Sequence, residues 1–299
     1  MKKAIILHNM GGARSEKELK EFLFNMFKDK RIIPSPIRHL LAPLISNFRY
    51  KKVWKNYELI GGSRIYKITQ SLCKKMENFT DYEVTFAFRY TKPFLKEIIF
   101  KYDEVIFLPL YPHYSFTTYE SSIDDLKNTG FKGKVSIVKP FFENKKFNEI
   151  IAKNILKEIK DPKEWHLIFS AHGIPKKFID KGDLYENHVK KHVEILKNIL
   201  PKFKSINLAY QSRFGFSQWL QPYLDEKLEE FKGEKVIIYP LSFMIDNSET
   251  DLELKIEYKH LANEIGINSY KVISPPNDSE EIAKFLVELA HESGNSKSN

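Results

Sequence analysis

Short apolar runs alternate with longer amphipathic stretches along the whole chain of 299 residues. This alternation is typical of βα units, in which helices join the strands of a parallel sheet. It predicts an α/β protein. Strands are expected near residues 3–8, 82–88, 103–109, 134–138, 166–171, 205–210, 234–239 and 269–273. Helices are expected near 15–28, 93–101, 119–129, 146–160, 183–199, 219–231, 248–264 and 279–292.

The predicted strands divide evenly about the charged stretch 161–164, whose proline suits a linker. A typical domain has about 150 residues, so a chain of this length is expected to form two domains. We therefore predict domains at 1–160 and 161–299, each with a four-stranded parallel sheet flanked by helices. The last helix, near 279–292, is expected to pack back on the first domain.

One segment departs from the βα rhythm. Between residues 31 and 49, apolar side chains recur at near-helical spacing and are followed by basic residues. An ordinary helix packed on the core is one interpretation. The other is an apolar lip at about 32–48 that borders a cleft and contacts a lipid surface or a greasy substrate. Prolines at 34, 36 and 43 argue against one regular buried helix.

Composition narrows the class of protein. The formal net charge of +9 comes from lysines spread along the chain, so it does not imply a nucleic acid partner. The single cysteine, Cys73, excludes an internal disulfide and an iron–sulfur cluster held by this chain alone. The first apolar run, of about five residues, is shorter than the core of a signal peptide, at least about seven. We expect a cytoplasmic protein, at most peripheral at the inner membrane surface.

Two candidate reactive residues follow predicted strands in the second half. His172 ends the run Leu167 to Ala171, and Glu249 follows the strand near 234–239. Ligands of open α/β sheets bind at the carboxyl ends of strands, so both side chains are expected to face one cleft. An imidazole there can accept a proton or ligate a metal. The alternative is that both belong to ordinary polar loops, which turns and helix caps require.

Glu249, Glu253 and Glu257 are spaced by four residues. On an α-helix they would share one face, although like charges at this spacing destabilise an isolated helix. A solvated charged surface is one interpretation. The other is a file of carboxylates that carries a divalent cation or protons. Asn247 or Ser248 is expected to cap this helix.

His188 and His192 have the i, i+4 spacing of a zinc site. Val189 replaces the glutamate that such a motif requires, so we interpret them as part of a solvated helix face.

Six strand-end motifs, taken in order, resemble those of the ferrochelatase family over nearly the whole chain. They are Leu7 to Gly12, Phe88 to Tyr90, Leu110 to Ser115, Phe169 to Pro175, Tyr210 to Gly215 and Pro240 to Thr250.

The resemblance implies two Rossmann-like domains with the active-site cleft between them. It implies an enzyme, a lyase of heme and porphyrin biosynthesis that inserts ferrous iron, its substrate, into protoporphyrin IX and releases two protons. No tightly bound cofactor is implied, and a monomer is favoured. The pair His172 and Glu249 matches the catalytic and metal-binding residues, with Glu253 and Glu257 as further metal ligands. By the same resemblance, the residues at porphyrin-binding positions are Met10, Arg89, Tyr90, Tyr111, Ser115 and Arg213.

Two positions depart from the family pattern. Asn247 stands where the family commonly has a histidine, and His113 stands where it commonly has a glutamine. A mechanism that needs two histidines is therefore in doubt unless His113 compensates. Three activities stay open: a ferrochelatase, a chelatase for another metal or for coproporphyrin, and a non-catalytic tetrapyrrole carrier.

Overall fold

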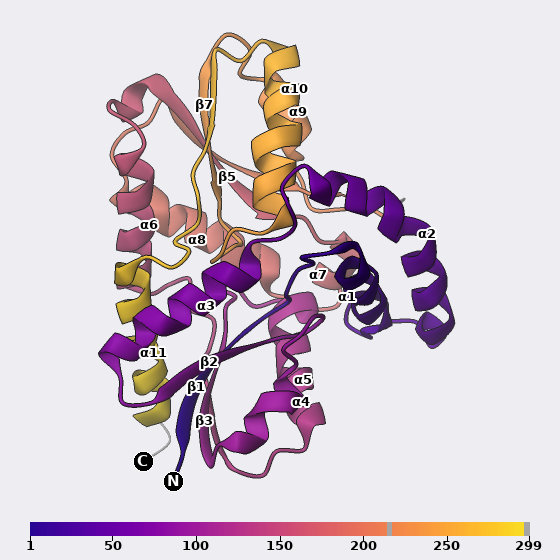
Figure 1. The fold of residues 1–299 in the computed structure, drawn as a ribbon. Helices are drawn as coiled ribbons and strands as arrows, with labels where there is room; N and C mark the ends of the chain where they lie inside the picture. Colours follow the sequence, from indigo (N-terminus) through magenta and orange to yellow (C-terminus); the bar gives the residue numbers. More distant parts are fainter. Residues whose placement is uncertain (214–216, 296–299) are drawn as a thin grey trace. The chain divides into compact units, whose positions relative to one another are not determined.

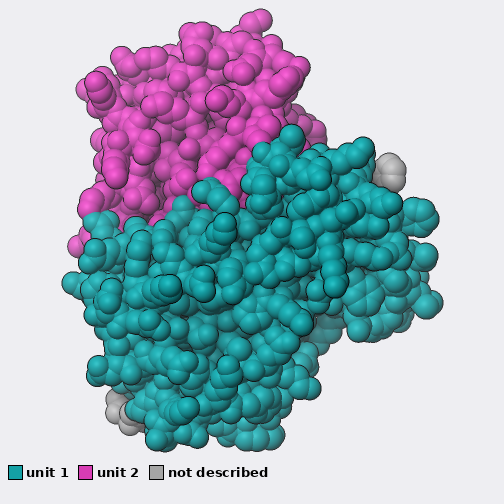
Figure 2. Space-filling model, viewed as in Figure 1, with its two compact units in different colours: residues 1–111, 115–140, 277–299 teal, residues 112–114, 141–276 magenta. Residues whose placement is uncertain are grey.

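The computed structural model describes residues 1–213 and 217–295. The chain forms two compact units, coloured separately in Figure 2. Unit 1 contains residues 1–111, 115–140 and 277–299, and unit 2 contains 112–114 and 141–276. The last four residues of unit 1 and residues 214–216 of unit 2 lie outside the described part of the chain.

The sheet of unit 1 is fully parallel, with the order β2-β1-β3-β4. Its central strands are apolar because helices shield them from water. Residues 4–7 of β1 are completely buried. The strands are β1 (Lys3–Asn9), β2 (Glu83–Phe88), β3 (Glu104–Pro109) and β4 (Lys134–Ile137).

The helices of unit 1 largely match the predicted ones, with one addition. The α-helix α3, which the sequence did not predict, lies before β2, and α11 packs beside it (Figure 1). The α-helices are α1 (Glu16–Lys28), α2 (Arg38–Glu58), α3 (Ile65–Met76), α4 (Leu95–Ile98), α5 (Ser121–Thr129) and α11 (Glu280–Asn295). The 3₁₀ helices of this unit are η1 (Glu77–Phe79) and η2 (Ile99–Lys101), and its π-helix is η3 (Phe116–Glu120).

The segment that departs from the βα rhythm is not one regular helix, because α2 begins only at Arg38, after the prolines at 34 and 36. Pro43 lies inside α2 and does not end it, since the helix continues to Glu58. Its second half packs on α1 through Tyr57 and neighbouring aromatic residues. The first half instead exposes large apolar side chains, so the interpretation as an ordinary core helix is wrong for this face. They are Leu40, Leu44 and Phe48, and Ile37, the residue before the helix, is exposed as well.

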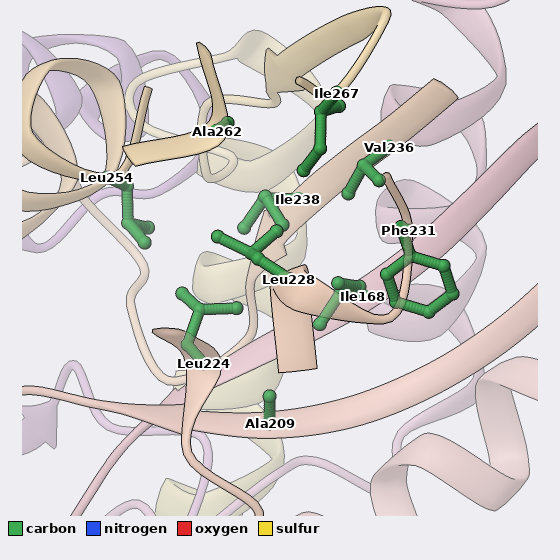
Figure 3. Close-up of a cluster of buried hydrophobic side chains, with 10 residues drawn as sticks. All are labelled: Ile168, Ala209, Leu224, Leu228, Phe231, Val236, Ile238, Leu254, Ala262 and Ile267. Atoms are coloured by element: carbon green, nitrogen blue, oxygen red, sulfur yellow. The ribbon is translucent and has the colours of Figure 1, made fainter. Parts of the chain in front are cut away.

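Unit 2 repeats the topology of unit 1, with the parallel order β6-β5-β7-β8. Its strands are β5 (Trp165–His172), β6 (Ser205–Gln211), β7 (Lys235–Pro240) and β8 (Ser269–Val272). The two four-stranded parallel sheets that the sequence predicts are therefore confirmed. One core cluster joins strand side chains such as Ile168 and Ile238 to Leu224 and Leu228 of a covering helix (Figure 3).

The helices of unit 2 include a long π-helical segment. The predicted helix at 248–264 is η5 followed by α10, and the predicted helix at 219–231 contracts to α9. The α-helices are α6 (Lys145–Lys157), α7 (Lys176–Ile179), α8 (Tyr185–Ile199), α9 (Leu224–Glu229) and α10 (Tyr258–Ile265). The others are the 3₁₀ turn η4 (Pro162–Glu164) and the π-helix η5 (Glu249–Glu257).

The contacts within each unit divide the chain differently from the predicted boundary at residue 160. Helix α6 belongs to unit 2, because its apolar face packs beside α8. The charged stretch 161–164 is a turn inside unit 2 rather than a linker. Helix α11 belongs to unit 1, where it contacts α3, β3 and β4. Within residues 1–213 and 217–295, no helix combines the length and apolar character that a membrane span requires.

Candidate functional site

The candidate site of unit 2 is built at the point where its strand order reverses. Strand β5 lies between β6 and β7, which both follow it in sequence. His172 is the last residue of β5, and it is paired in register with Gln211, the last residue of β6. In open parallel sheets the crevice at such a reversal binds ligands. The topology alone therefore brings these two side chains to one place.

The backbone of His172 is held from two sides. Its N–H donates to the hydroxyl of Ser242 at 3.1 Å, and its carbonyl accepts a hydrogen bond from Tyr185 at 2.9 Å. The next residue, Gly173, has no room for a side chain, because a Cβ there would lie 2.8 Å from the carbonyl oxygen of Gln211. The imidazole is thus presented on a fixed backbone.

The structure brings His172 and Glu249 into direct contact. Nδ1 of His172 lies 2.7 Å from Oε2 of Glu249. The side chains are 37% and 24% exposed, so both are reachable from solvent yet partly shielded. The two residues are far apart in sequence. The hypothesis drawn from the sequence required them to lie close together, and they do.

The charges around His172 favour its protonated form. Burial by itself lowers the pKa of His172, but the negative charges of Glu249 and Glu253 outweigh it and raise the pKa above the ordinary 6.5. Glu253 binds its proton more tightly than a solvated carboxylate does. Burial, and then the charge of Glu249, raise the pKa of Glu253 to about 7. The cluster therefore holds protons near neutral pH, which suits proton transfer.

Two residues at the end of β6 hold Glu253. Its Oε2 accepts hydrogen bonds from the side-chain amide of Gln211, at 3.1 Å, and from the hydroxyl of Ser212. Oγ of Ser212 also lies 3.5 Å from Oε2 of Glu249, so it spans the two carboxylates. Ser212 has a φ of +67°, a left-handed conformation that is uncommon for a residue with a Cβ. Strained conformations of this kind concentrate at functional sites.

The loop before Glu249 is fixed by a side-chain cap and by an ion cluster. Oδ1 of Asn247 accepts the backbone N–H of Glu249 at 2.8 Å, so Asn247 rather than Ser248 caps this segment. Nζ of Lys255 lies 3.1 Å from buried Asp246 and 2.9 Å from Asp251. These contacts join the start of η5 to the loop that follows β7.

The three glutamates of η5 do not share one environment. The segment is π-helical, with a backbone hydrogen bond that spans five residues, from Tyr258 to Glu253. Glu249 and Glu253 lie in the cluster around His172, whereas Glu257 is exposed. In the described part of the chain, no three His, Cys, Asp or Glu side chains are already arranged to hold a metal.

The predicted porphyrin-binding residues of unit 1 differ in accessibility. The guanidinium of Arg89 lies 3.2 Å from both Asp29 and Asp125, so its charge is offset internally. Tyr90 is buried and donates to Asp29 at 2.9 Å. Ser115 is buried and accepts the N–H of Thr117 as the cap of η3.

Met10 and Tyr111 are partly exposed. Arg213, in unit 2, is paired with Asp225 and Glu226 and stacks on Tyr223. A propionate would have to compete with two carboxylates for this guanidinium, which is more exposed than that of Arg89, at 45% against 21%. Phe214 and Gly215, the end of its motif, lie outside the described residues.

Comparison with known proteins agrees with these motifs. The ferrochelatase family model matches residues 2–294. The chain belongs to the ferrochelatase family. It is 45% identical to the ferrochelatase of Campylobacter concisus, over 96% of this chain and 97% of that protein. It is 44% identical to the ferrochelatase of a Nitratiruptor species, over 96% and 98%. The resemblance identified from the sequence is confirmed, and the chain is a metal chelatase of the lyase class.

Two solved structures share the fold of this chain at low sequence identity. SirB from Bacillus subtilis, solved with Fe3+, matches with a TM-score of 0.62 and 11% identity, over 100% of this chain and 98% of that one. CbiX, described as the terminal enzyme of siroheme biosynthesis in denitrifying bacteria, matches with a TM-score of 0.55 and 11% identity, over 98% and 99%. These two likenesses concern the fold alone.

The position where the ferrochelatase family commonly has a glutamine, here His113, lies in a buried histidine cluster. Nε2 of His113 lies 2.8 Å from Nδ1 of His192, and both rings are buried. The interpretation of His188 and His192 as a solvated face is therefore wrong: His192 is in the core and His188 packs on Phe142. Burial lowers the pKa of His192 to about 3, so this ring stays neutral.

Sequence reasoning did not assign Gln211, Ser212 or Ser242 to the site. Gln211 and Ser212 were part of a family motif, and their place at a strand end was the available signal. Asn247, where the family commonly has a histidine, was noted as a departure, and the structure gives it a capping role instead.

We predict that Glu249→Gln lowers the pKa of His172, because burial then acts against fewer compensating charges. Nuclear magnetic resonance titration of the imidazole measures this directly. Glu257→Gln is the matched control, since this exposed member of the same run should leave the His172 pKa unchanged. An equal effect of both changes would contradict the contact-based explanation.

Proposed function

We propose that this chain inserts ferrous iron into protoporphyrin IX, forming protoheme and releasing two protons. The observation that carries this proposal is the 2.7 Å contact between His172 and Glu249, beside a second carboxylate, Glu253. Insertion needs a base for the pyrrole protons and ligands for the incoming ion. Imidazole and carboxylate groups supply both.

His172 is the proposed base. In the neutral ring Nδ1–H donates a hydrogen bond to Glu249, so the lone pair lies on Nε2, the nitrogen that is free to accept a proton from the substrate. When Nε2 takes a pyrrole proton, the imidazolium remains paired with Glu249. General-base catalysis of this kind typically contributes about 10²- to 10⁴-fold.

The glutamates of η5 form the proposed route for iron. Exposed Glu257 meets the hydrated ion, and Glu253 and Glu249 provide hard oxygen ligands closer to His172. Glu253, with its pKa of about 7, also accepts a proton at neutral pH. We assign Met10 and Tyr111 to the porphyrin face. We assign Arg89, Tyr90 and Ser115 to the part of the pocket that supports Met10 and Tyr111. Arg213 is assigned to bind a propionate of the porphyrin.

His172→Ala should abolish metal insertion, because the substitution removes the base and a metal ligand together. Porphyrin affinity should remain within about threefold, since this residue contributes little ring contact. Anaerobic absorbance spectroscopy with protoporphyrin and ferrous iron measures both quantities. His260→Ala, an exposed histidine of α10, is the control. Near-normal turnover by His172→Ala would refute the assignment.

A second candidate activity is insertion of another metal, or use of coproporphyrin, because an imidazole–carboxylate site does not exclude cobalt, nickel or zinc. We expect the highest kcat/KM for ferrous iron with protoporphyrin. Initial rates over a panel of metals and both porphyrins test this directly. A higher kcat/KM with another pair reassigns the substrate, and binding without any metallation indicates a tetrapyrrole carrier.

We further propose that the chain acts as a cytoplasmic monomer without a tightly bound cofactor. All the proposed chemical groups come from one chain, and one cysteine cannot provide the thiolates of an iron–sulfur cluster. The exposed apolar face of α2 favours peripheral contact with the inner membrane surface. Phe48 is 84% exposed and Leu40 is 70% exposed, and basic residues follow along the same helix.

The triple change of Leu40, Leu44 and Phe48 to serine should strongly weaken binding to anionic vesicles at physiological salt, because it removes the apolar contact while salt screens the remaining charge. Cosedimentation at that salt concentration measures the bound fraction. Phe100→Ser is the matched control, because Phe100 is also exposed in unit 1 but lies outside α2. Equal vesicle binding by the triple variant and the wild type would exclude this surface.

A further inference from the structure

A chain of buried hydrogen bonds in unit 2 leads from the interior of the sheet to Glu253. Ser170, on β5, and Gln211, at the end of β6, are 0% and 1% exposed. The hydroxyl of Ser170 donates to Oε1 of Gln211 at 2.6 Å. The amide nitrogen of Gln211 then donates to Oε2 of Glu253 at 3.1 Å.

Chemistry fixes the direction of this chain. The ionised form of Glu253, which is the form that binds a cation, only accepts hydrogen bonds, so in that form the amide turns its nitrogen toward Glu253. Its oxygen then faces inward and needs a donor, which Ser170 provides. A buried carbonyl without that donor would carry a desolvation cost, and the amide would lose its preference for one orientation. Ser170 thus sets the orientation of a group that it reaches only through Gln211.

We propose that Gln211, oriented by Ser170, is a positioning residue that holds Glu253 beside Ser212 and Glu249 and thereby sets the affinity of this cluster for ferrous iron. The inference rests on the proposed function, because it assigns iron as the ligand of these carboxylates. Outer partners of metal-binding side chains affect affinity strongly, and their loss typically weakens binding by about 10- to 100-fold.

Two variants test the proposal. Ser170→Ala removes only the donor that orients the amide, and Gln211→Met keeps a side chain of similar length but removes the amide that donates to Glu253. The KM for ferrous iron should rise by about 10-fold or more in both. The KM for porphyrin should stay within about twofold, because neither residue is assigned to the ring. A purely structural defect would lower kcat without separating the two KM values.

Ser205→Ala is the matched control. Ser205 lies at the opposite end of β6 and loses a comparable hydrogen bond, to His166 at 2.7 Å, without contacting the cluster. Its KM for iron should equal that of the wild type. Thermal unfolding of each variant identifies any that fails to fold, in which case the other variant carries the test.

Calorimetric titration with Co2+, in the absence of porphyrin, separates this inference from the proposed function. The affinity for Co2+ should fall by about 10- to 100-fold in Gln211→Met. If the wild type binds Co2+ and inserts no metal, the proposed function fails, and the change in Co2+ affinity still supports the positioning role. Unchanged KM for iron and unchanged Co2+ affinity in both folded variants would overturn it.

Discussion

The contact between the imidazole of His172 and the carboxylate of Glu249 is the interaction on which the site depends. It joins the end of β5 to the start of η5. The parallel sheet fixes the first partner and the capped loop fixes the second, so neither has to be ordered by substrate. Preorganised polar groups of this kind cost little reorganisation during reaction. The surrounding elements hold these two side chains in contact.

The two units use charge in different ways. In unit 1 the guanidinium of Arg89 is offset by aspartates, and the burial of Tyr90 against Asp29 makes that cluster rigid. Around His172, by contrast, two carboxylates face one imidazole. The second arrangement carries excess negative charge whenever both acids are ionised. It therefore attracts a divalent cation, even though the whole chain carries a net charge of +9.

The sequence predicted the sheets well because buried parallel strands are short continuous apolar runs with little ambiguity. It also placed His172 and Glu249 at strand ends, from which their meeting followed. It did not predict the π-helical η5, because a pattern of spacing by four does not distinguish i+4 from i+5 hydrogen bonding. The burial of His192 was missed because its partner, His113, is distant in sequence. Gln211 was missed because its role appears only through the side chains that it joins.

The left-handed conformation of Ser212 has a consequence for the balance between stability and activity. A backbone angle of this kind costs a residue with a Cβ roughly 1 to 3 kcal/mol, and glycine largely avoids that cost. Glycine would relax the turn yet remove the hydroxyl that spans the two carboxylates. Greater stability of the fold and higher turnover therefore favour different residues at this position. Serine at this position keeps the hydroxyl although its backbone conformation lowers the stability of the fold.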